Sequence, residues 1–341
     1  MPIVQELFAD VFGSHIGKHS ERLLYTKGKT VLAQPPLMHL EQVIIASRGV
    51  SISADAIAEC CERGIPIFFL TSIGEPIATL SAPGLSGTVL TRRAQLTAYI
   101  DGRGAAISLA IADAKINNQA ATLKYVAKSR KESDPALYDL LRDASIETAA
   151  QADKLLGLRG MSLDDLRVYL MAFEANAATQ YWGALRNVIP EMYGWTERTT
   201  RGATDPVNSL LNYGYGILRT RVDNALHLAG LDSFAGFIHA DRPGKPSLTL
   251  DMMEEFRSVA VDRLVIGLVN RRYTVEMTEQ GRLHDDVRRS FAGKMKEHLQ
   301  ATVRYDGARF PIALVIQKQA RRLAAYLRGE TEVYLPYKAE W

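Results

Sequence analysis

One stretch of the chain, residues 205–257, gathers residue types that bind divalent metal ions. His239 lies in a Gly-containing bend, and the acids Asp251 and Glu254 open a predicted helix after it. A further acid, Glu174, belongs to an earlier predicted helix. Imidazole and carboxylate donors together suit Mn²⁺ or Mg²⁺. Such an ion assists phosphoryl transfer by stabilising charge on the phosphate oxygens and activating an attacking hydroxyl.

Each of these residues also has an ordinary structural interpretation. Glu174 lies within an apolar helix, where an ionised carboxylate is costly unless it is paired, and Arg167 is one candidate partner. His239 can be a core or capping histidine. Asp251 and Glu254 share a helix face, and acids in a first helical turn are stabilised by the helix dipole whatever their function. The sequence leaves these alternatives open for any one residue, and the set together favours a metal site.

Motifs of several competing chemistries are absent from the sequence. A carboxylate-bridged di-iron bundle needs Glu-x-x-His pairs on two helices, and the chain contains none. There is no Walker-type phosphate loop and no Gly-x-Ser-x-Gly elbow. Transesterification directly by a bound hydroxyl needs no covalent enzyme intermediate, so the lack of a nucleophile motif is consistent with it.

The elements that must position these residues belong to a chain of ordinary globular composition. Its 341 residues are 47% hydrophobic and 23% charged, a length and composition that indicate two domains. The formal net charge is +3, so overall basicity is no argument for nucleic-acid binding. Basic pairs recur beyond residue 90, but most such pairs are solvated helix faces.

The secondary-structure signals predict an α+β multidomain protein. Residues 1–85 are rich in strand signals and are expected to form a small β-strand-rich domain with one short helix. Residues 86–102 are expected to supply a linker and a first helix, and residues 103–341 a larger all-α domain that holds the metal site. Exposed sheet edges in such a small β domain are often paired with a second copy, so we expect dimerisation through it.

Local signals predict several elements. Residues 20–33 hold two β-rich runs around a Lys-Gly-Lys turn, which indicates a hairpin. Ser53 is expected to cap a short helix, and Ser162 with Asp165 three residues later resembles a capping box before the helix that carries Glu174. Residues 250–269 are expected to be helical throughout.

The sequence predicts a soluble cytoplasmic protein. Its two cysteines, Cys60 and Cys61, are adjacent and offer neither a disulfide framework nor zinc-ligand spacing. The amino terminus lacks a basic segment followed by an apolar core, and no apolar run approaches the roughly 18 residues that cross a bilayer.

The sequence resembles the CRISPR-associated adaptation integrases, the Cas-one family. The resemblance is collinear over nearly the whole chain. The order and spacing of the shared segments make the resemblance specific. These segments are RGVSISADA at 48–56, RGIPIFFL at 63–70, GEPIATLSAP at 74–83, TRRAQLTAY at 91–99, AKINNQ at 114–119, Glu174 ahead of Tyr181-Trp182, DPVNSLLNYGYGIL at 205–218, GFIHAD at 236–241, SLTLDMMEEFR at 247–257 and VDR at 261–263.

The resemblance implies a metal-dependent DNA endonuclease and integrase of CRISPR spacer acquisition. The 3′-hydroxyl ends of short DNA fragments would be joined into the CRISPR repeat by transesterification. Glu174, His239 and Glu254 would be the catalytic residues and the ligands of Mg²⁺ or Mn²⁺, with Asp251 near enough to assist. The last acid is an aspartate in some relatives and a glutamate in others, so Glu254 fits the pattern.

The resemblance also implies the partners. The amino-terminal domain would pair two copies into a homodimer, and a small Cas-two subunit would bridge two such dimers. The DNA partners would be protospacer fragments and the CRISPR repeat with its leader, and no membrane is implied.

Residues near the expected ligands are candidates for DNA contacts. Asn208, Tyr213 and Tyr215 could position a phosphate or stack on a splayed base, although the tyrosines could equally be packing residues. Lys245 and Arg257 flank the ligands and could contact phosphates, or be ordinary surface charges. Further candidates of the same kind are Arg92, Arg93 and Lys115.

Two other functions compete with this interpretation. A plain nuclease would cut branched or single-stranded DNA without joining ends, and would need no 3′-hydroxyl on a donor. A scaffold would bind partners through its helical domain, and its acids would be structural. The presence of Glu174, His239 and Glu254 in one chain argues against a scaffold.

Overall fold

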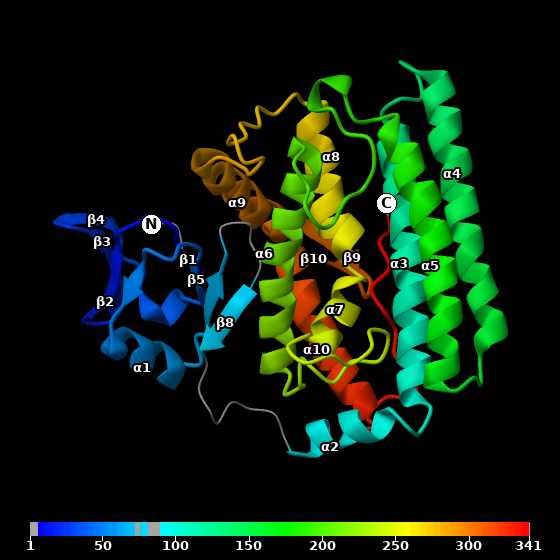
Figure 1. The fold of residues 1–341 in the computed structure, drawn as a ribbon. Helices are drawn as coiled ribbons and strands as arrows, with labels where there is room; N and C mark the ends of the chain where they lie inside the picture. Colours follow the sequence, from blue (N-terminus) through cyan, green and yellow to red (C-terminus); the bar gives the residue numbers. More distant parts are fainter. Residues whose placement is uncertain (1–5, 72–75, 81–88, 341) are drawn as a thin grey trace. The chain divides into compact units, whose positions relative to one another are not determined.

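A computed structural model describes residues 6–71, 76–80 and 89–340. The chain divides into two compact units, Met1–Ser86 and Gly87–Trp341. The first unit is rich in strands and the second is helical (Figure 1), which confirms the predicted fold class. The expected linker at 86–88 lies outside the described residues.

The first unit contains two four-stranded sheets. In one, three strands are parallel and the fourth pairs antiparallel at an edge; in order they are β1 (Glu6–Ala9), β5 (Gln42–Ile45), β7 (Ile67–Leu70) and β8 (Pro76–Leu80). In the other, β6 pairs parallel to β2 and the remaining pairs are antiparallel; in order they are β4 (Thr30–Ala33), β3 (Arg22–Lys27), β2 (His15–His19) and β6 (Ser51–Ile52).

The local predictions for this unit are confirmed. Strands β3 and β4 form the expected hairpin, and its turn places Gly28 at φ +58°, which glycine adopts without steric cost. The Ser53 side chain caps α1 (Ala54–Glu62) by accepting a 3.1 Å hydrogen bond from the Ala56 N–H. Leu7, Ile16 and Val43 are buried in the core between these elements. A short 3₁₀ turn, η1 (Leu37–His39), leads into β5.

The second unit begins with α2 (Val89–Ala98) and a layer of three long helices that lie side by side (Figure 1). The layer consists of α3 (Arg103–Lys128), α4 (Pro135–Asp153) and α5 (Leu163–Arg186), with η2 (Lys154–Leu158) joining the last two. The cap at Ser162 is confirmed, because its hydroxyl accepts from the Asp165 N–H at 3.3 Å. The Asp165 carboxylate accepts from the Ser162 hydroxyl at 2.7 Å, and not from its backbone N–H as in a capping box.

The remaining elements pack around α6. They are η3 (Glu191–Tyr193), α6 (Pro206–Leu228), α7 (Ser247–Met253), η4 (Arg257–Asp262), α8 (Arg263–Asn270), α9 (Asp285–Gln300), β9 (Thr302–Tyr305), β10 (Ala308–Pro311) and α10 (Ile312–Leu327). Asp205 caps α6, and Pro206 follows it at the first helical position, where a missing N–H costs nothing. The extended segment after α10 returns to lie beside α3 (Figure 1).

Two features of this unit differ from the sequence-based prediction. The predicted continuous helix at 250–269 is wrong, because α7 ends at Met253 and η4 is a π-helical segment before α8. Hairpin β9–β10 was not predicted; its Asp306-Gly307 turn has φ values of +50° and +76°, the left-handed pair that an Asp-Gly sequence favours. In the described part of the chain, no helix is long and apolar enough to span a membrane.

Candidate metal and DNA site

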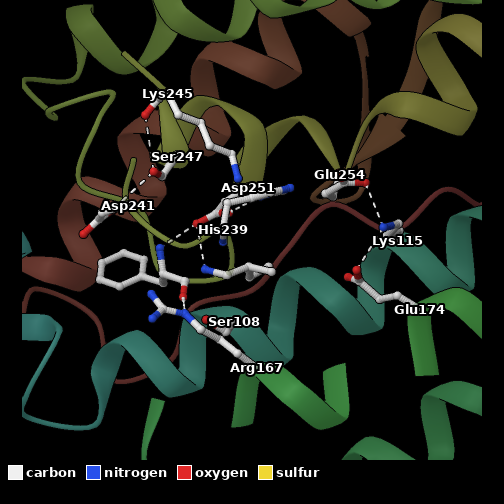
Figure 2. A network of polar contacts seen from close by, with 12 residues as sticks. Ser108, Lys115, Arg167, Glu174, His239, Asp241, Lys245, Ser247, Asp251 and Glu254 are labelled. Atoms are coloured by element: carbon white, nitrogen blue, oxygen red, sulfur yellow. Dashed lines mark hydrogen bonds and ion pairs between the residues drawn. The ribbon is translucent and has the colours of Figure 1, made fainter. Parts of the chain in front are cut away.

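Helices α3 and α5 and the turn after α7 bring one lysine and two carboxylates together. The Lys115 Nζ lies 3.0 Å from Glu174 Oε2 and 3.1 Å from Glu254 Oε2. Figure 2 shows the three side chains side by side, with His239 and Asp251 as a second group. The two acids predicted to be ligands are therefore neighbours, although they are 80 residues apart in sequence.

Amphipathic packing of α5 directs Glu174 towards the interior. The fully buried residues Leu170 and Ala177 lie four before and three after it, on the same helix face. Arg167, one of its candidate partners, instead donates to the Phe237 carbonyl at 2.8 Å and pairs with Asp164. Lys115 from α3 supplies the compensating charge.

The carboxylate of Glu254 is held ionised by its surroundings. Burial raises its pKa, but the charges of Arg257, Lys115 and His239 outweigh burial and lower the pKa to about 2. Burial lowers the pKa of Lys115, and the charges of Glu254 and Glu174 more than compensate, so its pKa is raised. The cluster is thus a buried arrangement of charged groups that stabilise one another.

Asp251 fixes the position of His239. Its two oxygens accept backbone N–H bonds from Phe237 at 2.6 Å, Ile238 at 3.0 Å and His239 at 3.0 Å. A fourth contact, at 2.7 Å, joins Asp251 Oδ1 to His239 Nδ1. With Nδ1 as the donor, Nε2 carries the lone pair that can bind a metal. Asp251 is fully buried, and all four contacts assign it to orienting the imidazole.

The bend that carries His239 needs a glycine. A Cβ at Gly236 would lie 2.5 Å from the Ser247 carbonyl carbon, so only glycine allows the bend to approach the start of α7 this closely.

The donor atoms of these residues are of the types that bind a divalent ion, but their present positions do not form a complete site. Among the described residues, Glu174 Oε1 is a buried oxygen without a hydrogen-bond partner, and Glu254 Oε2 is a buried oxygen that lies 3.1 Å from the Lys115 ammonium. Orphaned carboxylate oxygens of this kind are suitable ligands. Within the residues described, however, no three His, Cys, Asp or Glu side chains stand close enough to share an ion. Lys115 lies between the two carboxylates, so a shared ion requires its ammonium to move.

A further buried carboxylate, Asp262, is connected to the cluster through Tyr215 and Arg257. The hydroxyls of Tyr215 and Tyr181 both donate to Asp262, the latter at 2.9 Å. The Arg257 guanidinium lies 4.9 Å from the centre of the Tyr215 ring, and its Nε is 3.1 Å from Glu254 Oε1. The π-helical segment η4 begins at Arg257 and ends at Asp262, so it links the cluster to this carboxylate.

The predicted DNA contacts divide into buried and accessible residues. Asn208 is 1% exposed; it donates to the Glu197 carbonyl and the Asp205 carboxylate, and accepts from Arg198 and the Thr199 N–H. Tyr213 is also buried, and its ring packs 6.2 Å from that of Phe291.

Tyr215 is enclosed as well, because the guanidinium of Arg198 lies 5.3 Å from its ring centre and that of Arg257 lies on it too. None of Asn208, Tyr213 and Tyr215 offers a face on which a base could stack in this arrangement. Lys245 and Arg257 are partly exposed, and Figure 2 shows Lys245 extending towards His239. Arg92 and Arg93 are exposed on α2.

Sequence reasoning missed two parts of the site. Lys115 was expected to contact phosphate, whereas it pairs with both predicted acids; the signal was a lysine among the apolar positions of α3. Asp262 belongs to the VDR segment, and the sequence does not indicate its burial against two tyrosines, because that depends on how α5, α6 and η4 pack together.

The comparisons with known proteins agree with one another. A family model described as CRISPR associated protein Cas1 matches residues 7–297. A CRISPR-associated endonuclease Cas1 from Archaeoglobus fulgidus is 36% identical over 98% of this chain and 99% of its own length.

Solved structures share the fold. A casposase bound to integration product has a TM-score of 0.82 at 22% identity, over 99% of this chain and 95% of its own. A chain of a Cas6-RT-Cas1–Cas2 complex has a TM-score of 0.74 at 21% identity, over 99% of this chain and 36% of its own. The predicted resemblance is confirmed, and family membership implies an enzyme that depends on a divalent metal. The chain belongs to the CRISPR-associated Cas1 endonuclease family.

Proposed function

We propose that this protein joins the 3′-hydroxyl ends of short DNA fragments into a CRISPR repeat by transesterification. The observation that carries the proposal is a pair of carboxylates, Glu174 and Glu254, that converge on one ammonium, with an oriented histidine nearby. Because in-line transfer between phosphodiesters needs mainly positioning and charge stabilisation, no covalent nucleophile is required.

The proposed ligands of the ion are Glu174, Glu254 and His239 Nε2, with Mg²⁺ or Mn²⁺ as the ion. When bound, such an ion would stabilise charge on the scissile phosphate and activate the attacking hydroxyl. Asp251 holds the imidazole in place, and it is proposed as a positioning residue, not a ligand, because its oxygens already accept four contacts.

The proposed phosphate contacts are Arg257 and Lys245. Arg257 contacts Glu254 and the face of Tyr215, so its guanidinium has a defined position beside a proposed ligand of the ion. Lys245 has a flexible four-carbon side chain, and its ammonium provides positive charge on the side of His239. A Cas2 subunit is the proposed protein partner, and the strand-rich unit is proposed to pair two copies of this chain.

A joining assay with two kinds of donor tests the proposal. A short duplex with 3′-hydroxyl ends and the same duplex with 3′-deoxy ends are each incubated with a repeat-containing plasmid, the protein, Cas2 and Mn²⁺. We expect joining only with the 3′-hydroxyl donor. Glu174→Gln and His239→Ala should lower joining to background, and Glu147→Gln, an exposed acid on α4, should leave it unchanged.

The outcomes separate the candidate functions. Plasmid cleavage that is equal with both donors would favour a plain nuclease. Joining that persists in the folded Glu174→Gln and His239→Ala variants would remove these residues from the reaction. Melting curves establish that each variant is folded before it is assayed.

A further inference from the structure

A groove lined by basic side chains lies on the helical unit, on another face from the carboxylate cluster. The last turns of α3, the first half of α4 and hairpin β9–β10 line a cavity of about 860 Å³. One acid, Glu340, reaches it, against six basic side chains. The basic residues are Lys124, Lys128, Lys131, Arg142, Arg304 and Arg309.

Two of the six cations are ion-paired, Arg142 with Asp139 and Asp143 and Arg304 with Glu340, and the other four are available to a ligand. Lys124, Lys128 and Lys131 are exposed, and within the described ranges no carboxylate lies at ion-pair distance from them. The Arg309 guanidinium donates to the hydroxyl and carbonyl oxygens of Thr302, at 3.3 and 3.0 Å, and no carboxylate of the described residues pairs with it. Uncompensated charges of one sign inside a concave surface focus the electric field, so the groove attracts an anion.

The groove is separate from the metal site. Lys124 follows Lys115 by nine residues on one continuous helix, which is about 2.5 turns. The two side chains therefore point to opposite sides of α3. Lys115 pairs with Glu174 and Glu254, and Lys124 faces solvent.

The basic surface continues past the end of α3. A neighbouring cavity of about 650 Å³ shares Tyr125 and Lys128 with the groove and adds two cations, Arg130 and Arg263, and one acid, Asp134. The Arg263 guanidinium lies 3.9 Å from the centre of the Tyr125 ring, and Arg130 donates to Asn270 at 2.9 Å. The cations thus form an extended track, as the regularly spaced phosphates of a nucleic acid require.

The lining favours DNA over an acidic protein. Protein interfaces have an apolar centre, but the aliphatic residues that line this groove, Ala127 and Val303, are buried. The accessible rings are Tyr125, which is 42% exposed, and the half-buried Tyr138, and aromatic rings among cations suit sugars and bases. We propose that this groove binds the phosphodiester backbone of DNA, apart from the metal site. The proposal rests on the proposed function, since it assigns a second contact with the same class of substrate.

The test is DNA binding by a variant with K124Q, K128Q and K131Q combined. Fluorescence anisotropy with a labelled duplex is measured over a series of salt concentrations. If all three lysines contact phosphates, the slope of log K against log salt should become shallower by about 2 to 3. Affinity near 0.1 M salt should fall roughly tenfold or more.

The matched control removes three other exposed charges, by K27Q, K29Q and R48Q in the strand-rich unit. It should keep the wild-type slope. An unchanged slope in the K124Q/K128Q/K131Q protein, or a loss equal to that of the control, would overturn the proposal. So would a lysine variant that loses affinity for poly-glutamate while binding the duplex normally, because the groove would then be a protein-binding surface.

The joining assay separates this inference from the proposed function. Glu174→Gln should abolish joining and retain the wild-type salt slope. If wild-type protein joins no DNA but the lysine variant still loses its slope, the groove stands and the proposed function fails. If joining occurs and the lysine variant binds duplex like wild type, only the groove fails.

Discussion

Lys115 compensates the charges of two neighbouring acids, the buried Glu254 and the partly buried Glu174. Glu174 and Glu254 approach the same ammonium within about the length of a hydrogen bond, and without it they would repel each other in a site with little solvent. A divalent ion would also neutralise these carboxylates, with two positive charges where the ammonium has one. The side chain therefore competes with a metal for the position between the acids.

Lys115→Met tests this competition. We expect the variant to unfold more easily in EDTA, by about 3 kcal/mol, because a buried pair of acids has lost its partner. Mn²⁺ should raise the melting temperature of the variant more than that of wild type, since the ion no longer has to displace an ammonium. Thermal melts with EDTA and with Mn²⁺ measure both effects.

Lys115→Arg, which keeps the charge, is the control and should behave more like wild type in EDTA. A Lys115→Met protein with the wild-type response to Mn²⁺ would show that the lysine and the ion do not compete.

At the scale of elements, the π-helical segment η4 joins the cluster to Asp262. Burial raises the pKa of Asp262 to about 6, although the hydrogen bonds from Tyr215 and Tyr181 lower it. An unfolded aspartate titrates near 3.9. Between these values the folded chain binds a proton that the unfolded chain has released, so the free energy of unfolding falls as pH rises.

Asp262→Asn should remove this part of the pH dependence. From pH 4 to pH 6.5, wild type should lose up to about 3 kcal/mol of stability relative to the variant. Urea denaturation at steps across this range measures the difference. Glu255, whose pKa burial also raises to about 6, is present in both proteins and cancels in the comparison. Parallel curves for the two proteins would show that Asp262 is not the titrating group.

At the scale of the whole helical unit, the carboxy-terminal segment closes over α3. Asn118 donates to the Tyr337 carbonyl at 2.9 Å and accepts from the Ala339 N–H at 2.7 Å. Glu255, next to the proposed ligand Glu254, accepts from the Tyr337 N–H at 2.8 Å and from the Tyr334 hydroxyl. The segment thus supports the site through hydrogen bonds between residues that are 79 to 221 positions apart in sequence.

Two substitutions of Tyr337 separate packing from hydrogen bonding. Its ring stacks on Phe256 with centroids 5.3 Å apart, and its hydroxyl is buried with no hydrogen-bond partner among the described residues. Tyr337→Ala should cost about 3 kcal/mol or more, since it leaves a cavity. Tyr337→Phe should be nearly neutral because no hydrogen bond is lost. Denaturant melts of both variants check this; equal losses would mean that the hydroxyl carries the stability.

The sequence by itself determined several turns and helix caps, the family, and the class of chemistry of this protein. Turn and capping chemistry predicted the β3–β4 hairpin and the caps at Ser53 and Ser162. The order of motifs identified the family, and the residue types at Glu174, His239 and Glu254 indicated divalent-metal chemistry. These features depend on near neighbours in the chain or on residue identity.

Only the tertiary structure decided which charges meet. Asp251 binds the His239 bend, Lys115 lies between two acids from other helices, and Asn208 and Tyr213 are enclosed, because each outcome depends on which faces pack together. The break after Met253 has the same origin, since an apolar pattern predicts a helix but not a π-helical segment within it. From sequence alone, the lysines of the groove are indistinguishable from ordinary solvated charges. The packing of α3, α4 and hairpin β9–β10 places them around one concave surface.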